Sequence, residues 1–300
     1  LENPPYRCPT NEELRLENTA KQEAEAAERE RCAAEAKAKQ EAEENIQREK
    51  KIRLQRFHDS QLLANSEYPP VEINESEISA QDKEIYERLV PHFCSKDRHN
   101  FEYKVLSELH DFLTSKNIDY WAIGGTLLGQ MKYSGTIPWD HDIDIFTEQL
   151  SENTEDELIE LISKIEGCAI RRWLWSNRIP GIQIHDMRNG PAIAIDIFYG
   201  EFHGDTIYTK GMNIEKFPSK GRQGVDRIIN PGSRMANFGN TKISVPNVES
   251  TIEYLDWKFG ENWEDEYVIF DFKEKTSISF PANDRIDEKL RSFVVNRSLK

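Results

Sequence analysis

The first 120 residues of this chain contain neither glycine nor tryptophan. All 15 glycines lie at or after Gly124, and all six tryptophans lie at or after Trp121. Proline is also missing between Pro9 and Pro69. Glycine and proline are the residues that most often make tight turns, so their absence excludes a turn-rich N-terminal part. The chain therefore divides into two regions of different construction.

Other absences exclude whole classes of protein. No run of about 20 apolar residues is present, so the sequence predicts no membrane-spanning helix. The four cysteines include no CxxC pair, which argues against a zinc site. With 54 acidic and 39 basic residues the formal net charge is -15, and a nucleic-acid binder that relies on positive charge is excluded. The chain begins with Leu1 instead of Met, which leaves open that a segment precedes it.

A charged, alanine-rich segment spans residues 11–57. It holds 12 acidic side chains, 11 basic side chains and nine alanines in 47 positions. These residue types lose little side-chain entropy in a helix, so the segment predicts one long solvated helix. Because alanine forms most of its apolar seam and buries little area, a stalk is favoured over a tight coiled coil. Self-association through this helix remains an alternative.

The sequence predicts three parts along the chain. Residues 1–67 form the helical stalk, residues 68–96 form a linker with a short helix, and residues 97–300 form the catalytic domain. Tyr68-Pro69-Pro70 ends the helical pattern, because proline cannot continue a helix. Apolar spacing then predicts mixed α and β structure, with helices at 81–90, 98–116, 126–133 and 158–165 and strands at 120–123, 142–146, 169–175, 181–185 and 192–199.

The most informative motif is the acidic strand at residues 138–145, PWDHDIDI. Residues two apart share a face of a strand, so Asp142 and Asp144 point the same way and Asp140 continues the pattern. Nine carboxylates and no Lys or Arg lie between Tyr133 and Ser163. Crowded carboxylates repel unless a cation lies between them, and Mg²⁺ or Mn²⁺ is the natural counter-charge. The alternative is a solvated acidic strand end or a set of helix caps.

A second acidic strand and a glycine turn extend this pattern. Asp196 interrupts the apolar run AIAIDIF, where an unpaired carboxylate is costly to bury, and it is a candidate third ligand or a cap acceptor. Gly124, Gly125 and Thr126 open a helix, where backbone amides can approach a phosphate, although a simple tight turn explains the glycines equally. Together these elements match a nucleotidyltransferase palm, in which carboxylates hold a metal on nucleotide phosphates.

Several segments resemble the signature of the LicD/fukutin family. They are residues 124–129 (GGTLLG), 132–135 (KYSG), 137–145 (IPWDHDIDI), 196–198 (DIF) and 254–263 (YLDWKFGENW), so the resemblance covers roughly residues 98–265. It implies an α+β fold with a nucleotidyltransferase-like mixed-sheet palm and flanking helices. Lys132 stands where bacterial members usually carry Arg, and His141 replaces a middle Asp. Lysine can still neutralise a phosphate but lacks the bidentate fork of arginine.

The resemblance also implies an activity. A member of this family would move a phospho-alcohol, such as phosphocholine, phosphoethanolamine or phosphoribitol, from a CDP-linked donor to a glycan hydroxyl and release CMP. Asp142, Asp144 and Asp196 would be catalytic and would hold the metal with Asp140. The alternatives are a nucleotidylyltransferase that releases pyrophosphate and a non-catalytic scaffold. The compartment stays open between a secretory lumen and the cytoplasmic side of a membrane.

Basic residues supply candidates for donor binding. The segment 210–234 carries six basic side chains with four glycines and two prolines, so it predicts a mobile loop that closes on a diphosphate, or an ordinary surface loop. Arg178 follows two tryptophans on one strand face, which favours core packing over a choline cage. The expected substrate-binding residues are Gly124, Gly125, Thr126, Lys132, Arg178, Lys210 and Arg222.

Overall fold

The computed structural model describes most of the chain from residue 79 onward and part of the N-terminal segment. The described residues are 10, 12, 21, 26–41, 44–45, 48, 79–175, 179–221, 225–271, 276–282, 286–287, 290–291 and 294. The chain divides into two units, residues 1–59 and residues 60–300. Residues 68–78, the first part of the predicted linker, lie outside the described residues.

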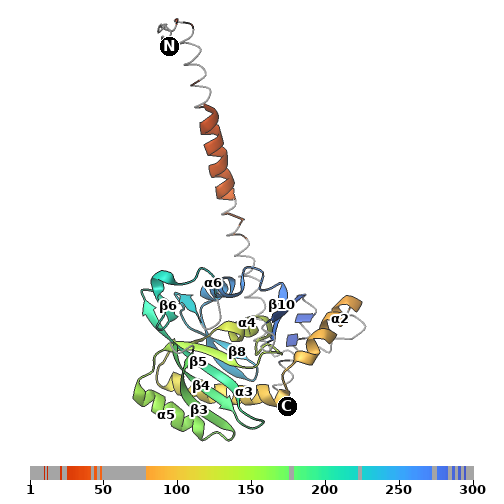
Figure 1. Cartoon of the computed structure of the whole chain (residues 1–300), viewed down its shortest axis with the longest axis vertical. Helices are drawn as coiled ribbons and strands as arrows, with labels where there is room; N and C mark the ends of the chain where they lie inside the picture. The colour runs from red at the N-terminus through yellow and green to blue at the C-terminus, as the bar shows by residue number, and fades with distance from the viewer. Residues whose placement is uncertain are drawn as a thin grey trace, which may run out of the picture. The chain divides into compact units, whose positions relative to one another are not determined.

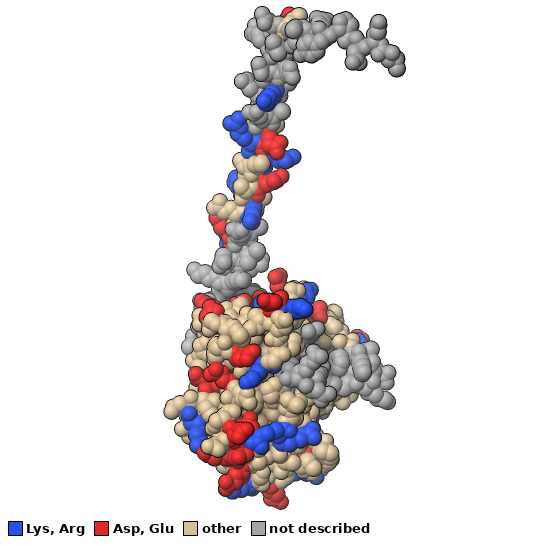
Figure 2. All heavy atoms as spheres, turned by 60° about the vertical axis from the view of Figure 1, so that its left-hand side comes forward, with Lys and Arg blue, Asp and Glu red and all other residues tan. Residues whose placement is uncertain are grey.

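The first unit contains a helix over residues 26–41, as its composition predicts. All of its described side chains are exposed, and acidic and basic groups are interspersed along it (Figure 2). Arg31 lies 3.2 Å from Glu28 and 3.6 Å from Glu35, and Lys37 lies 3.8 Å from Glu41. Such pairs one turn apart stabilise a solvated helix by a few tenths of a kcal/mol each. No described helix is both long and apolar enough to cross a membrane.

The second unit carries the remaining helices, and most of them begin at a polar cap. Ser95, Ser151 and Asn247 each accept a hydrogen bond from the backbone N–H three residues later, which satisfies a donor that the helix leaves open. The described helices are α2 (Ala80–Leu89), η2 (Val90–His92), α3 (Lys96–Ser115), α4 (Gly124–Tyr133), α5 (Glu152–Ser163), η3 (Ile214–Lys216) and α6 (Val248–Phe259).

A mixed sheet forms the centre of this unit (Figure 1). Its main path has the order β1-β2-β5-β4-β3, and β6 joins it beside β5, followed by β7. Strands β2 and β5 run parallel, and the other described neighbours in this sheet run antiparallel. The strands are β1 (Tyr120–Ala122), β2 (Ile143–Glu148), β3 (Cys168–Trp175), β4 (Ile179–Asp186), β5 (Ala192–His203), β6 (Thr206–Thr209) and β7 (Arg227–Ile229).

Two hairpins and four packed helices complete the unit. The hairpins are β8 (Arg234–Phe238) with β9 (Thr241–Val245) and β10 (Glu266–Asp271) with β11 (Thr276–Pro281). Helices α3 and α5 pack on each other and reach the sheet at β5 and β3, whereas α4 packs on β2 and against α6. This arrangement confirms the predicted α+β class and places the first turn of α4 over β2.

The structure changes the predicted bounds of two elements that matter for the site. Helix α5 begins at Glu152, six residues before the predicted start, because Ser151 caps an acidic first turn that apolar spacing alone does not reveal. Strand β2 begins at Ile143, so Asp142 precedes the strand and Asp140 lies in the turn before it. The alternation that holds for Asp144 therefore does not extend back to Asp140.

Candidate metal and phosphate site

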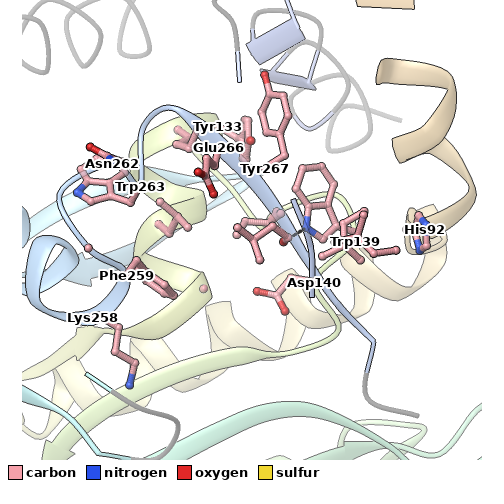
Figure 3. Close-up of a pocket in the computed structure, with 18 of the residues that line it drawn as sticks. His92, Tyr133, Trp139, Asp140, Lys258, Phe259, Asn262, Trp263, Glu266 and Tyr267 are labelled. Atoms are coloured by element: carbon pink, nitrogen blue, oxygen red, sulfur yellow. Dashed lines mark hydrogen bonds between the residues drawn. The ribbon is translucent and has the colours of Figure 1, made fainter. Parts of the chain in front are cut away.

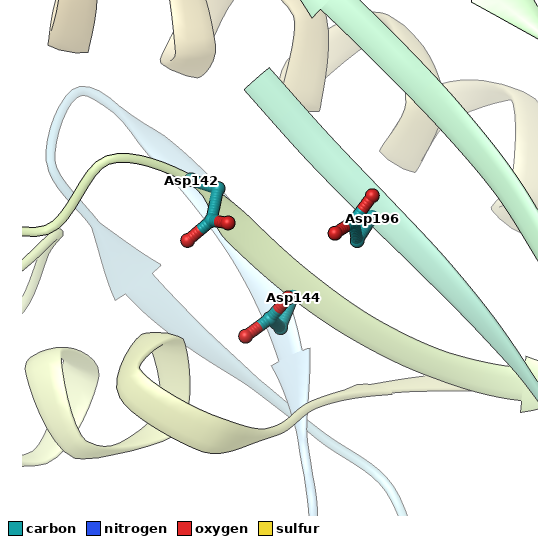
Figure 4. A group of neighbouring side chains, drawn as sticks. All are labelled: Asp142, Asp144 and Asp196. Atoms are coloured by element: carbon teal, nitrogen blue, oxygen red, sulfur yellow. The ribbon is translucent and has the colours of Figure 1, made fainter. Parts of the chain in front are cut away.

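Three carboxylates meet at the start of the parallel strand pair (Figure 4). Asp142 leads into β2, Asp144 lies within β2, and Asp196 lies on the neighbouring β5. One oxygen from each can be chosen so that all three atoms lie within 4.8 Å of one another. The structure thus brings together the three aspartates that the sequence predicts as metal ligands.

The backbone register explains why these side chains share one place. Asp144 lies directly opposite Asp196 in the parallel ladder, so both side chains leave the same face of the sheet. The flanking Ile143 and Ile145 are completely buried on the other face. Because that apolar face fixes the register, a one-residue slip would expose the isoleucines and bury the carboxylates among them. The core therefore holds the two acids side by side.

Burial raises the pKa of each acid in the metal-free protein, and repulsion from neighbouring aspartates raises the pKa of Asp144 and Asp196 further. Burial is the largest cause for Asp144, followed by the charges of Asp142 and Asp196, and it holds the pKa of Asp144 well above its usual range. Burial also raises the pKa of Asp142, although the Arg98 guanidinium opposes this shift. Burial raises the pKa of Asp196 to about 7, against a lowering hydrogen bond from Gln183. The site is therefore built to receive positive charge.

The residues present fit a hard divalent cation. Carboxylate oxygens are the ligands that Mg²⁺ and Mn²⁺ prefer, and one or two carboxylates with substrate phosphates are the usual Mg²⁺ environment. The glycine turn leaves room beside them: Gly124 has a φ of +55°, and a Cβ there would lie 2.9 Å from Asp144 Oδ2. Gln183 Nε2 donates to Asp196 Oδ1 at 2.8 Å and holds that carboxylate in place.

Asp140 is not part of the carboxylate cluster, which corrects its predicted role as a ligand. Among the described residues only Asp142, Asp144 and Asp196 form the cluster. The Asp140 carboxylate accepts the His141 N–H at 3.0 Å and lies so close to Gly125 that a Cβ there would be 2.2 Å from Asp140 Oδ2. Burial, followed by the charge of Asp142, raises the pKa of Asp140 to about 8. Asp140 therefore packs against the turn instead of sharing the face of Asp144.

The N–H of Gly124 already has a protein acceptor, which corrects its predicted contact with phosphate. It donates to the hydroxyl of Tyr254 on α6 at 2.8 Å, and that hydroxyl donates to Asp226 Oδ1 at 2.5 Å. Lys258 Nζ also donates to Asp226 Oδ1, at 2.6 Å. The four groups are buried or nearly so, and they tie α6 to the glycine turn.

Sequence reasoning missed Asp226, Tyr254 and Lys258 as neighbours of the site. Tyr254 and Lys258 lie four residues apart, so they share one face of α6, and this spacing was the available signal. Asp226 carried no such signal, because it lies in a loop segment predicted to be basic and mobile. The charge of Asp226 contributes to the raised pKa of Asp144, after burial and the three nearer aspartates.

Thr126 supports β2 in the structure and does not face an open phosphate site. Its Oγ1 accepts the backbone N–H of Asp144 at 2.8 Å, and the residue is almost fully buried. The backbone N–H of Ile123 donates to the Asp144 carbonyl at 3.1 Å. The first turn of α4 is therefore hydrogen-bonded to β2 on both sides of Gly124.

Lys132 is engaged by the C-terminal part of the second unit. Its Nζ donates to the Glu264 carbonyl at 3.0 Å, lies 3.9 Å from Asp287 Oδ1 and is 4.9 Å from the centre of the Tyr267 ring. Burial, opposed chiefly by Asp287, lowers the pKa of Lys132. These contacts hold Lys132 in place, and Lys132 also lines the pocket next to the glycine turn, so its predicted contact with donor phosphate stays a prediction.

Three described basic residues at or near the predicted loop have partners elsewhere than at the three aspartates. Lys210 Nζ donates to Gln149 Oε1, at an exposed position. Arg227 lies over the Trp257 ring at 5.3 Å, and Arg234 donates to the Pro246 carbonyl. Arg178 and Arg222 lie outside the described residues, so their predicted roles stay predictions.

A pocket of about 1070 Å³ adjoins the glycine turn (Figure 3). Gly125, Asp140 and Lys258 line it on the side nearest the carboxylates. Aromatic side chains form much of the remaining wall, and Trp139 Nε1 donates to the Val268 carbonyl, which fixes the indole ring there. The pocket therefore offers space for an organic substrate next to the glycine turn.

Comparison with known proteins agrees with this geometry. A family model described as LicD/FKTN/FKRP, nucleotidyltransferase domain, matches residues 117–248, which include all three aspartates. A stretch of 43 residues is 46% identical to uncharacterized proteins of Rickettsia prowazekii (strain Madrid E) and Rickettsia typhi (strain ATCC VR-144 / Wilmington). That stretch is 14% of this chain and covers 16% and 14% of the two relatives, so the chain spans only about a sixth of their length. Residues 117–248 thus confirm the predicted family: the chain carries a nucleotidyltransferase domain of the LicD/FKTN/FKRP family, a family of transferases.

Proposed function

We propose that this protein is a divalent-metal-dependent phosphotransferase. It would move a phospho-alcohol from a CDP-linked donor to a glycan hydroxyl and release CMP. The observation that carries the proposal is the carboxylate cluster Asp142, Asp144 and Asp196 on a parallel strand pair inside a LicD/FKTN/FKRP domain. Phosphoryl transfer needs chiefly positioning and charge neutralisation, and this cluster can supply both when it holds a cation.

The aspartates have distinct parts in this proposal. Asp142 and Asp144 hold Mg²⁺ or Mn²⁺, and a bound ion would neutralise and orient the diphosphate oxygens of the donor. The glycan hydroxyl attacks the distal phosphorus, the bond from that phosphorus to the CMP oxygen breaks, and the hydroxyl proton passes to a carboxylate. Asp196 serves either as the third ligand or as that proton acceptor. Metal affinity of Asp196→Asn separates the two roles, because the loss of a ligand weakens metal binding more than the loss of a proton acceptor outside the ligand set.

The surrounding residues supply the rest of the site. The network of Gly124, Tyr254, Asp226 and Lys258 fixes the turn above β2, so the acids keep their geometry when the donor enters. The pocket beside Gly125 and Asp140 would receive a substrate group.

Measurement of CMP release tests the proposal. The protein is incubated with Mg²⁺ and, in turn, CDP-choline, CDP-ethanolamine, CDP-ribitol and CDP-glycerol, because slow hydrolysis reports the donor even without an acceptor. We expect CMP from one donor, loss of the signal with a chelator, and loss in Asp144→Asn but not in Asp156→Asn, an exposed acid paired with Arg172. Pyrophosphate release from a nucleoside triphosphate would indicate a nucleotidylyltransferase instead. No release and no Mg²⁺-dependent nucleotide binding would indicate a scaffold.

A further inference from the structure

Arg98 makes contacts that join the two acid-bearing segments. It lies in the first turn of α3, and its Nη2 donates to the backbone carbonyl of His141 and, at 2.5 Å, to that of Ile193. His141 immediately precedes Asp142, and Ile193 lies three residues before Asp196 on β5. One guanidinium group therefore contacts both segments that enter the metal site.

The strand register shows where this contact lies relative to the ladder between β2 and β5. The parallel ladder between β2 and β5 begins with Ile143 opposite Ile195. Two residues further upstream, the same register would place His141 opposite Ile193. At that position the guanidinium of Arg98 bridges the two carbonyls. Arg98 therefore closes the end of the ladder three positions before the Asp144–Asp196 pair.

A buried carboxylate holds the guanidinium in place. Arg98 Nε donates to Glu102 Oε1 at 2.9 Å, one helical turn further along α3, and the Glu102 side chain is completely buried. The Ser95 cap accepts the Arg98 N–H at 3.2 Å, which fixes the first turn of the helix. With backbone and side chain both held, the guanidinium loses little further freedom when it bridges the carbonyls.

Repulsion between the acids favours separation of β2 and β5 at this end of the ladder. Asp144 and Asp196 are like charges directly opposite each other, an arrangement that destabilises a strand pair. Asp142 lies outside the strand, so no ladder hydrogen bond of β2 restrains it. A positive group behind the backbone opposes this repulsion without occupying the ligand position, and Arg98 accordingly lowers the pKa of Asp142.

We propose that Arg98 is a positioning residue that clamps the entry segments of β2 and β5 and thereby sets the separation of Asp142 from Asp196. Its role toward the metal rests on the proposed function. Residues behind the ligands of a metal site typically contribute 10–100-fold to metal affinity. We therefore expect the clamp to act on metal binding and on the backbone of the two strands, not on the chemistry of transfer directly.

The experiment compares Arg98→Met with Arg172→Met in the full chain. Arg172 is a matched control, because it also pairs with a nearly buried glutamate, Glu155, but it lies on β3 away from the acids. Mn²⁺ affinity is measured by electron paramagnetic resonance, and hydrogen exchange of residues 141–145 and 193–197 is followed without metal. We expect Arg98→Met to weaken Mn²⁺ binding about 10–100-fold and to speed exchange in both peptides about 10-fold or more, with Arg172→Met unchanged in both.

Each outcome decides the inference. Unchanged exchange and unchanged Mn²⁺ affinity in folded Arg98→Met would overturn the clamp while leaving the metal site intact. A wild-type protein that binds no Mn²⁺ would overturn the proposed function, and the exchange rates alone would then decide the clamp. If Arg98→Met does not fold, Arg98→Lys takes its place: a lysine keeps the charge but cannot reproduce the fork, so wild-type exchange and affinity in this variant would also refute the clamp.

Discussion

Replacement of Asp196 by Asn in the metal-free protein tests the electrostatics of the site most directly. Asp196 is 6% exposed, and burial raises its pKa from 3.8 to about 7. Asn keeps a carbonyl oxygen for the hydrogen bond from Gln183 but carries no charge at any pH. The variant therefore isolates the cost of ionising this one carboxylate among its neighbours.

The sign and size of the effect follow from proton linkage. An acid with a raised pKa binds more protons in the folded state, so its contribution to stability is complete below about pH 3.8 and falls as the pH rises toward about 7. A shift of about three pH units corresponds to about 4 kcal/mol, as an upper bound. Between about pH 5 and pH 8 this contribution to the free energy of unfolding falls by about 3 kcal/mol.

Urea unfolding followed by tryptophan fluorescence in a chelator measures this difference. We expect the free energy of unfolding of Asp196→Asn, relative to wild type, to become more favourable by about 3 kcal/mol between about pH 5 and pH 8. Asp156→Asn, at an exposed ion pair, serves as the control. For this variant we expect the difference in free energy of unfolding from wild type to stay constant over the same pH range. A difference for Asp196→Asn that is constant with pH would refute the reasoning. Added Mg²⁺ should stabilise the wild type more than the variant.

Three other changes test separate parts of the site. Asp144→Asn should lower CMP release by about 100-fold or more, because charge neutralisation at the phosphate is lost. The same variant should have a higher melting temperature in a chelator, and near-normal turnover would contradict the assignment of Asp144 as a metal ligand. Gly125→Ala should destabilise by about 1–3 kcal/mol, measured by urea unfolding, because its Cβ would lie 2.2 Å from Asp140 Oδ2, and Asp140→Ala should restore most of the loss. Tyr254→Phe should cost about 1–3 kcal/mol in the same assay, because the buried N–H of Gly124 loses its acceptor, and an unchanged stability would argue against that bond.

The local pattern of the chain predicts the α-helices and strands from α2 to β5, but none of the elements that follow β5 along the chain. Strand β5 and helix α3 follow from apolar spacing, and β2 follows from alternation, because each buries one face in the same core. The start of α5 was predicted too late, since its first turn is acidic and its cap, not its apolar spacing, marks the boundary. Capping is thus a better signal than periodicity at such a terminus.

The candidate site was predictable only where its residues follow one strand. Asp144 and Asp142 were found from their spacing, and Asp196 from the cost of a lone acid in an apolar run. Asp140 was wrongly included, because alternation was extended past the point at which β2 begins. The partners of Lys132 and of the Gly124 amide within the protein were not predictable, because they come from distant segments.

The sequence by itself determined the chemistry that the site can hold: carboxylates on a face that isoleucines anchor, a glycine turn before them, and few cations among them. The tertiary structure alone decided which groups meet. It paired Asp144 with Asp196 across a parallel ladder and brought Tyr254 to the glycine turn over 130 residues. It also placed Arg98 across the ends of two strands. Hydrogen bonds between distant segments leave no periodic trace in the chain, since any residue of suitable chemistry can complete them once the core has set the register.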